Sequence, residues 1–183
     1  MNDLSQLPTD LDLTRSRSMT LILTQDKARA GITELIAAQI LRSPLFVVAG
    51  SEWLPAFELT RILRKRTPVV RQALNRLSVA RASTCYRLFD SLVNVPSHGE
   101  PILVLDFLHT FYDSDIPLRV RFFKLRECCR QIKRLTLYRP IIVMTQEMPV
   151  EDYEKFLPAL CSIADQTFTL EAEPERIKQA VLF

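Results

Sequence analysis

Short, unbroken apolar runs alternate along the chain with segments in which apolar residues recur every three or four positions. Short continuous apolar runs are typical of strands that are covered on both faces, as in a parallel sheet. Four such strands are predicted, at residues 19–23 (MTLIL), 45–49 (LFVVA), 102–106 (ILVLD) and 141–145 (IIVMT). Two more polar strands are predicted, at residues 76–80 (RLSVA) and 166–170 (QTFTL).

Segments with helical periodicity fill the intervals between these strands. Helices are predicted at residues 32–41, 55–66, 83–93, 118–135, 151–160 and 174–181. Pro55 suits a first helical turn, Ser83 or Thr84 suits an N-cap, and residues 97–101 (SHGEP) predict a turn. Because parallel strands need long crossover connections, the pattern predicts an α/β fold, a three-layer α/β/α sandwich with a mostly parallel sheet.

The chain is long enough for one domain with a sizeable core, since it has 183 residues, of which 48% are hydrophobic and 25% charged. It has only three glycines, and no repeat or low-complexity stretch interrupts it. We expect a single domain over residues 18–183. Residues 1–17 lack the apolar region of a signal peptide. We expect them to form a partly ordered leader instead.

No apolar run approaches the roughly 20 residues that span a bilayer. We therefore expect no membrane partner and an intracellular location, in the cytoplasm and nucleoid or in the nucleus. The cysteines have no C-x-x-C spacing, and His98 and His109 are not spaced for zinc, so no metal site is expected. Reduced thiols at core or boundary positions are expected instead, at Cys85, Cys128, Cys129 and Cys161.

Charge is distributed unevenly along the chain. Residues 146–183 hold eight acids and three bases, a net charge of −5, so the rest of the chain carries +8 to reach the total of +3. A basic body favours an acidic or polyanionic partner. The alternative is a solvated charged surface without a ligand.

The densest group of bases lies in residues 118–139, which contain a single acid, Glu127. A helix of this composition is expected to bind nucleic-acid phosphates, with salt-sensitive and sequence-independent affinity. The candidate contacts are Arg119, Arg121, Lys124, Arg126, Arg130, Lys133 and Arg134. A second basic cluster comprises Arg61, Arg64, Lys65, Arg66 and Arg71.

The alternative for the basic helix is a solvated face, or one that forms salt bridges with the acidic C-terminal part. Aromatic side chains for base stacking are few. Phe111 and Tyr112 lie near the helix in sequence, whereas Phe122 and Phe123 are expected to face the core.

Four segments resemble parts of the RecA-like recombinase family, especially the archaeal and eukaryotic recombinases and their paralogues, over residues 20–170. Residues 46–52 (FVVAGSE) resemble the strand that ends in an Asp-Thr-Glu-Gly turn, which places Glu52 at the family's catalytic glutamate. Residues 77–82 (LSVARA), with Thr84 and Tyr86 after them, resemble the family's short strand and following helix. Asp106 ends a strand that resembles Walker B, and Gln146 ends one that resembles the strand with the sensor glutamine.

The resemblance implies a RecA-like P-loop NTPase core, but the phosphate-binding loop departs from the pattern G-x-x-x-x-G-K-[ST]. The matching residues read TQDKARAG: Thr24 and Arg29 replace the glycines, Ala30 replaces the lysine, and Gly31 replaces the hydroxyl that binds Mg²⁺. Side chains at the glycine positions obstruct the backbone amides that would surround a phosphate, because left-handed backbone angles cost non-glycine residues about 1–2 kcal/mol each.

The resemblance therefore implies a paralogue without catalytic activity that assists homologous recombination or DNA repair. It would pair with another RecA-like subunit and contact DNA, with no catalytic residue and no cofactor. Glu52, Asp106 and Gln146 would then be vestigial or structural. One alternative is a divergent ATPase that binds ATP and Mg²⁺ with Lys27 or Arg29. Others are a protein-interaction module without DNA contact and a regulatory α/β domain unrelated to recombination.

Overall fold

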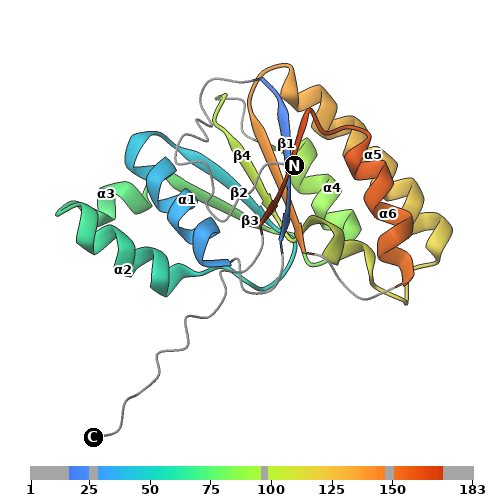
Figure 1. Ribbon diagram of the computed structural model, residues 1–183, viewed down its shortest axis with the longest axis horizontal. Coiled ribbons are helices and arrows are strands. Elements are labelled where there is room, and N and C mark those ends of the chain that lie inside the picture. Colours follow the sequence, from blue (N-terminus) through green and yellow to red (C-terminus); the bar gives the residue numbers. More distant parts are fainter. Residues whose placement is uncertain (1–16, 25–28, 96–98, 147–150, 171–183) are drawn as a thin grey trace, which may run out of the picture.

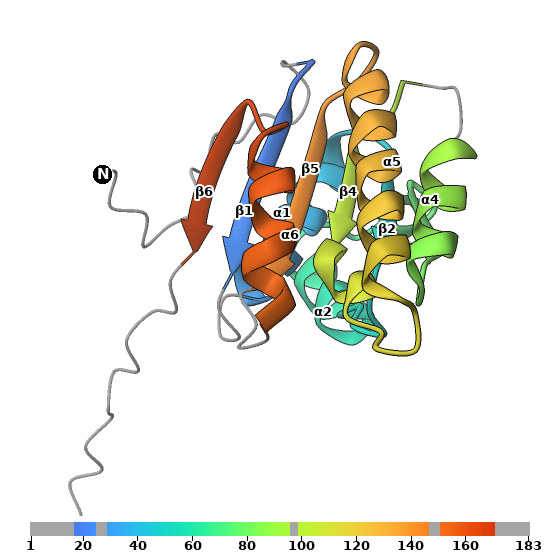
Figure 2. The ribbon, with the colours of Figure 1, turned by 90° about the vertical axis from the view of Figure 1, so that its right-hand side faces the viewer.

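The computed structural model describes residues 17–24, 29–95, 99–146 and 151–170, and these form an α/β fold around one parallel sheet. The six strands lie in the order β3-β2-β4-β5-β1-β6, and every neighbouring pair is parallel. Figure 2 shows the strands pointing the same way, with β6 at one edge. The strand bounds are β1 Met19–Thr24, β2 Leu45–Ala49, β3 Leu77–Arg81, β4 Ile102–Leu105, β5 Ile141–Gln146 and β6 Gln166–Leu170.

Helices cover both faces of the sheet, as Figure 1 shows. The first face carries α1 (Arg29–Arg42), α2 (Ala56–Arg66) and α3 (Val70–Leu74). The second face carries α4 (Cys85–Val93), the 3₁₀ helix η2 (Phe107–Phe111), α5 (Leu118–Thr136) and α6 (Glu151–Cys161). The predicted α/β/α layers are confirmed for the described residues.

Each central strand contributes side chains to both cores. Because successive side chains alternate between the faces, Leu21 and Val48 pack on the α4–α6 side, whereas Ile22 and Val47 pack on the α1–α3 side. All five residues of β2 are buried. This two-sided burial explains why the strands appear in the sequence as continuous apolar runs.

The predicted elements agree with the structure to within a few residues, with two differences. The helix α3 and the 3₁₀ helix η2 have no counterpart in the prediction, because each is only five residues long and shows no full helical repeat. The predicted strand over residues 102–106 ends at Leu105, because Asp106 adopts left-handed backbone angles, with φ 50° and ψ 44°. Of the two N-caps predicted for α4, the structure has Thr84, whose side chain accepts a hydrogen bond from the Arg87 amide.

The predicted leader apart from Arg17, residues 97 and 98 of the predicted turn and the helix at residues 174–181 lie outside the described residues. In the part of the chain that the structure describes, no helix combines the length and apolar character needed to cross a membrane. Of the four cysteines, Cys161 is exposed, and the three buried ones are Cys85, Cys128 and Cys129.

Candidate functional site

The positions that resemble RecA-family functional residues come together along one edge of the sheet. Strands β2, β4, β5 and β1 are neighbours in that order, and parallel strands all end at the same edge. Ala49 of β2 is paired with Leu105 of β4, and Gln146 of β5 is paired with Thr24 of β1. Glu52, Asp106, Gln146 and the start of the 24–31 segment therefore follow four adjacent strand ends. We call this row the carboxyl edge.

Gly50 allows the ends of β2 and β4 to approach closely. Its amide donates a hydrogen bond to the Leu105 carbonyl at 2.8 Å. A Cβ atom at this position would lie 2.5 Å from the Asp106 carbonyl oxygen and 2.9 Å from that of Leu105. Because both contacts are to backbone, only glycine fits between the two strand ends.

Asp106 is held by the turn that follows Gly50. Its side chain is buried, with 4% of the residue exposed, and its carboxylate accepts a short hydrogen bond from the Ser51 hydroxyl. The Ser51 oxygen in turn accepts a hydrogen bond from the Trp53 amide at 3.1 Å. The Asp106 carbonyl accepts from the His109 amide at 3.0 Å, which begins η2. The Asp106 side chain thus joins two strand ends within the protein.

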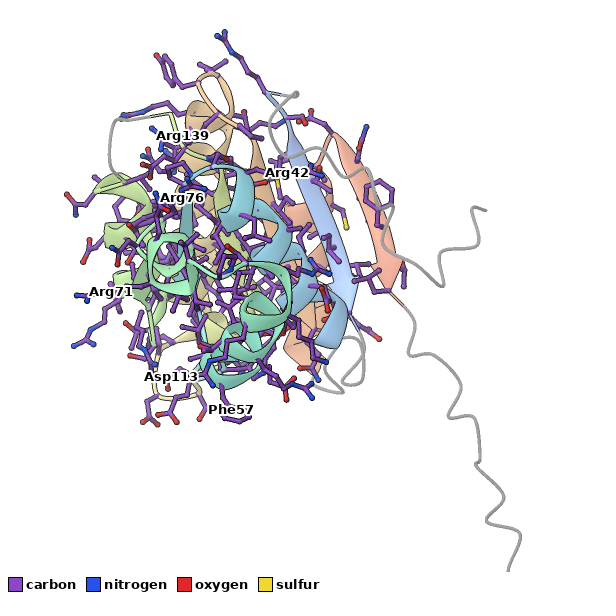
Figure 3. The ribbon with its side chains drawn as sticks, turned by 90° about the vertical axis from the view of Figure 1, so that its left-hand side faces the viewer. Arg42, Phe57, Arg71, Arg76, Asp113 and Arg139 are labelled. Carbon is purple, nitrogen blue, oxygen red and sulfur yellow. The ribbon has the colours of Figure 1, made fainter. Side chains whose placement is uncertain are left out.

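The other two RecA-matched side chains at the carboxyl edge are more open. Glu52 is exposed and Gln146 is half-buried. Trp53 is half-buried and packs against the core beneath α1–α3. Asp113 and Asp115 are also exposed, and Figure 3 shows Asp113 and Phe57 of α2 toward the same end of the molecule.

The segment matched in sequence to a phosphate-binding loop, residues 24–31, is described only at its two ends. Thr24 is buried, and its hydroxyl donates to the Thr145 carbonyl at 3.5 Å. Lys27 lies outside the described residues, and the backbone of α1 begins at Arg29. Gly31, in the first turn of α1, has no side chain to offer a metal ion. Within the described ranges, no group of three or more His, Cys, Asp or Glu side chains is arranged to hold a metal.

The basic helix predicted at residues 118–135 is α5, and its bases divide into two sets. Arg121 is 7% exposed, and its Nη1 donates to the Phe111 carbonyl at 3.0 Å. The structure therefore removes Arg121 from the nucleic-acid candidates, because a buried guanidinium cannot reach a phosphate. Lys124 is half-buried and pairs with Glu127 at 2.8 Å. The exposed members are Arg119, Arg126, Arg130, Lys133 and Arg134.

Lys133 forms a salt bridge with Asp165 at 3.2 Å. Asp165 belongs to the acidic C-terminal part, so a salt bridge between this helix and that part, the alternative named above, is present at Lys133. The hydrogen bonds that Asp165 accepts from the Met19 amide, at 2.7 Å, and from Lys133 hold the pKa of its carboxyl below the ordinary value of 3.8. The second basic cluster, on α2 and α3, is exposed at all five of its positions.

The aromatic side chains near α5 are placed differently from the prediction. Phe111 is fully buried and Tyr112 is half-buried, which leaves neither as an open stacking partner. The expectation that Phe123 faces the core is wrong, because 55% of it is exposed. Tyr86 on α4 is 45% exposed, and sequence reasoning missed it as a surface aromatic. Helical spacing from the buried Cys85 and Leu88 could have indicated that Tyr86 faces outward.

The chain matches no protein-family model, and a search of curated proteins finds no significant match.

Proposed function

We propose that this chain is a RecA-like recombinase paralogue without catalytic activity, which assists homologous recombination or DNA repair by binding another RecA-like subunit and DNA. The sequence resemblance is the basis for the family and the process. The arrangement of the carboxyl edge is the basis for the absence of catalysis.

The state of Asp106 is the observation that carries the proposal. Phosphoryl transfer needs a phosphate grip, a metal ion and a positioned water together. The carboxylate of Asp106, which is matched to Walker B, is buried and accepts a hydrogen bond from Ser51. These contacts support a structural role for Asp106. Glu52 and Gln146 lie at the ends of the two strands beside β4, and in this proposal they have no nucleotide to act on.

The surroundings of the carboxyl edge support the same conclusion. Gly31 stands where the magnesium-binding hydroxyl is needed, and Ala30 stands where the phosphate-binding lysine is needed. An assembly can still use a subunit of this kind, because a fold offers contact surfaces whether or not its site is active.

Isothermal titration of the purified full chain with ATP and Mg²⁺ tests the loss of catalysis. We expect no binding heat at micromolar to millimolar nucleotide, and no phosphate release above a buffer blank. Micromolar affinity that disappears in Lys27→Ala or Arg29→Ala, while Lys65→Ala on α2 keeps it, would replace the proposal with the divergent ATPase.

Direct mixing with the RecA-like recombinases of the organism that encodes the chain tests the partnership. We expect at least one of them to form a complex that elutes together in size-exclusion chromatography, with a defined mass by light scattering. If every recombinase elutes separately at concentrations far above micromolar, the assignment to recombination is wrong.

A further inference from the structure

The outer surface of α4 and α5 combines exposed aromatic rings with exposed guanidinium groups. On α5, Arg119, Phe123, Arg126 and Arg130 recur at intervals of three or four residues, so they form one stripe on the side facing away from the sheet. Tyr86 of the neighbouring helix α4 lies beside this stripe, and Figures 1 and 2 show the two helices packed next to each other. We call these five residues the aromatic–basic surface.

Lys124 connects the rings of the two helices. Its ammonium lies 5.5 Å from the ring centre of Tyr86, 4.8 Å from that of Phe89 and 5.8 Å from that of Phe123. Cation–π contacts of this length attract the rings toward the charge. The salt bridge to Glu127 holds the ammonium in place and raises the pKa of Lys124, although partial burial opposes this. Tyr86 and Phe123 thus both lie close to the Lys124 ammonium, while about half of each of the two residues remains exposed to solvent.

The charge of this side of the molecule favours a polyanion. Among the described residues of α4 and α5, Asp90 is the only exposed acid. The exposed bases on the same two helices are Arg87, Arg119, Arg126, Arg130, Lys133 and Arg134. From Arg119 to Arg134 the helix rises by about 22 Å, which is long enough for several phosphates to bind in a row.

From this arrangement we propose that the aromatic–basic surface binds single-stranded DNA, with Tyr86 and Phe123 stacking on bases and Arg119, Arg126 and Arg130 contacting phosphates. Aromatic side chains that are exposed among basic side chains provide a platform on which nucleobases stack. The basic side chains form a positively charged stripe that follows the sugar–phosphate backbone. A duplex hides the faces of its bases, so it can use the arginines but not the rings. The inference rests on the proposed function, which includes DNA binding. It adds which form of DNA binds and which surface binds it.

Fluorescence anisotropy of a labelled oligothymidylate, titrated with the full chain at low salt, tests the inference. We expect salt-dependent binding whose logarithmic slope is about −0.7 for each phosphate contacted. Tyr86→Ala and Phe123→Ala are each expected to weaken binding about tenfold and leave the slope unchanged. The double variant Arg126→Gln/Arg130→Gln is expected to weaken binding and make the slope shallower by about 1.4. A duplex of the same length should bind more weakly and be insensitive to the aromatic variants.

The opposite side of the molecule supplies matched controls. Phe57→Ala removes an aromatic side chain that is 79% exposed on α2, and Arg64→Gln/Lys65→Gln removes two exposed bases from the same helix. Both should leave binding unchanged within twofold. Circular dichroism and urea unfolding of every variant establish that it is folded, which the exposure of the substituted side chains leads us to expect.

Three results would overturn the inference: no binding in the unsubstituted chain at low salt, equal losses in the α2 controls, or equal binding of duplex with no effect of the aromatic variants. Loss of recombinase binding in Phe123→Ala without loss of DNA binding would identify the surface as a protein interface instead. These readouts are separate from the nucleotide and partner tests. A chain that pairs with a recombinase but binds no single strand would leave the proposed pairing standing and remove this inference alone.

Discussion

At the scale of single residues, the carboxyl edge depends on backbone geometry more than on its charged side chains. Asp106 is the one non-glycine residue with positive φ among the described residues, and this angle turns the chain directly from β4 into η2. Asp tolerates the left-handed region better than most residues. Gly50 provides the space on the facing strand end, so the two residues form one tight junction.

Gly50→Ala is expected to destabilise the protein by about 3 kcal/mol or more, because the new methyl group meets two backbone carbonyls that cannot move independently. Gly99→Ala is the matched control. Gly99 has φ +76° with open space around it, so its replacement costs only about 1–2 kcal/mol of backbone strain. Urea unfolding of both variants measures the difference, and equal losses would contradict the steric account of the junction.

At the scale of elements, α5 has one side that packs in the core and one side that faces solvent. The composition of the helix does not show which of its basic residues lie on which side. Arg121 reaches back to the Phe111 carbonyl, and its guanidinium lies 5.8 Å from the ring centre of Phe156 on α6. It therefore joins η2, α5 and α6. Arg119, two residues earlier, is exposed. The same residue type thus packs the core at one position and carries surface charge at another.

Arg121→Gln is expected to lower the free energy of unfolding by about 1–3 kcal/mol, because the shorter side chain leaves the buried Phe111 carbonyl without this donor. Arg119→Gln makes the same substitution on the exposed side of the same helix turn and should change stability by less than about 0.5 kcal/mol. Thermal and urea unfolding monitored by circular dichroism compare the two. A similar loss in both would mean that Arg121 has no special structural role.

At the scale of the whole molecule, Asp165 holds together segments far apart in sequence. Its carboxylate accepts from the Met19 amide at the start of β1, and its own amide donates to the Met19 carbonyl at 2.9 Å. Lys133, near the end of α5, pairs with the same carboxylate. One side chain therefore joins the beginning of the sheet to the turn before β6 and to the second helix layer.

The pKa of Asp165 is lowered on folding, so the ionised carboxylate stabilises the protein above the ordinary value of 3.8, and this contribution is lost as pH falls through the lower folded value. Asp165→Asn is expected to cost about 1 kcal/mol at neutral pH, a modest amount because the side chain is nearly half exposed. Urea unfolding across a pH series should show this deficit narrowing below pH 3.8. A deficit independent of pH would contradict the electrostatic origin.

The burial of the cysteine thiols predicts which of them react with an alkylating reagent in the folded protein. Burial raises the pKa of Cys129 to about 12 and also raises that of Cys128 and Cys85. Burial also raises the pKa of Cys161, but Cys161 is the exposed thiol. N-ethylmaleimide should therefore add first to Cys161 alone in the native protein and to all four cysteines in denaturant. Intact mass spectrometry counts the adducts, and Cys161→Ser is the control that should abolish the fast one. Several fast native adducts would mean that the α4–α5 core opens readily.

The central strands could be predicted from sequence because burial on both faces imposes a local pattern. Residues 45–49, the fully buried strand β2, were predicted with the bounds that the structure shows, and so were residues 166–170 of the more exposed edge strand β6. The short elements were not predicted, since α3 and η2 are held by tertiary contacts rather than by a full helical repeat. At the candidate site, the sequence indicated Asp106 and its neighbours as strand-end positions. It did not indicate Ser51 as the partner of Asp106, because that contact spans 55 residues.

The sequence by itself determined the class of fold, because alternating apolar runs and helical periods leave little besides helices packed on a parallel sheet. It also determined the departure of residues 24–31 from a phosphate-binding loop, which depends on residue identity alone. Only the tertiary structure decided the order of the strands, the burial of Arg121 and the grouping of Tyr86 with Phe123 around Lys124. These features depend on contacts between distant segments, and a local pattern contains no information about which segments will meet.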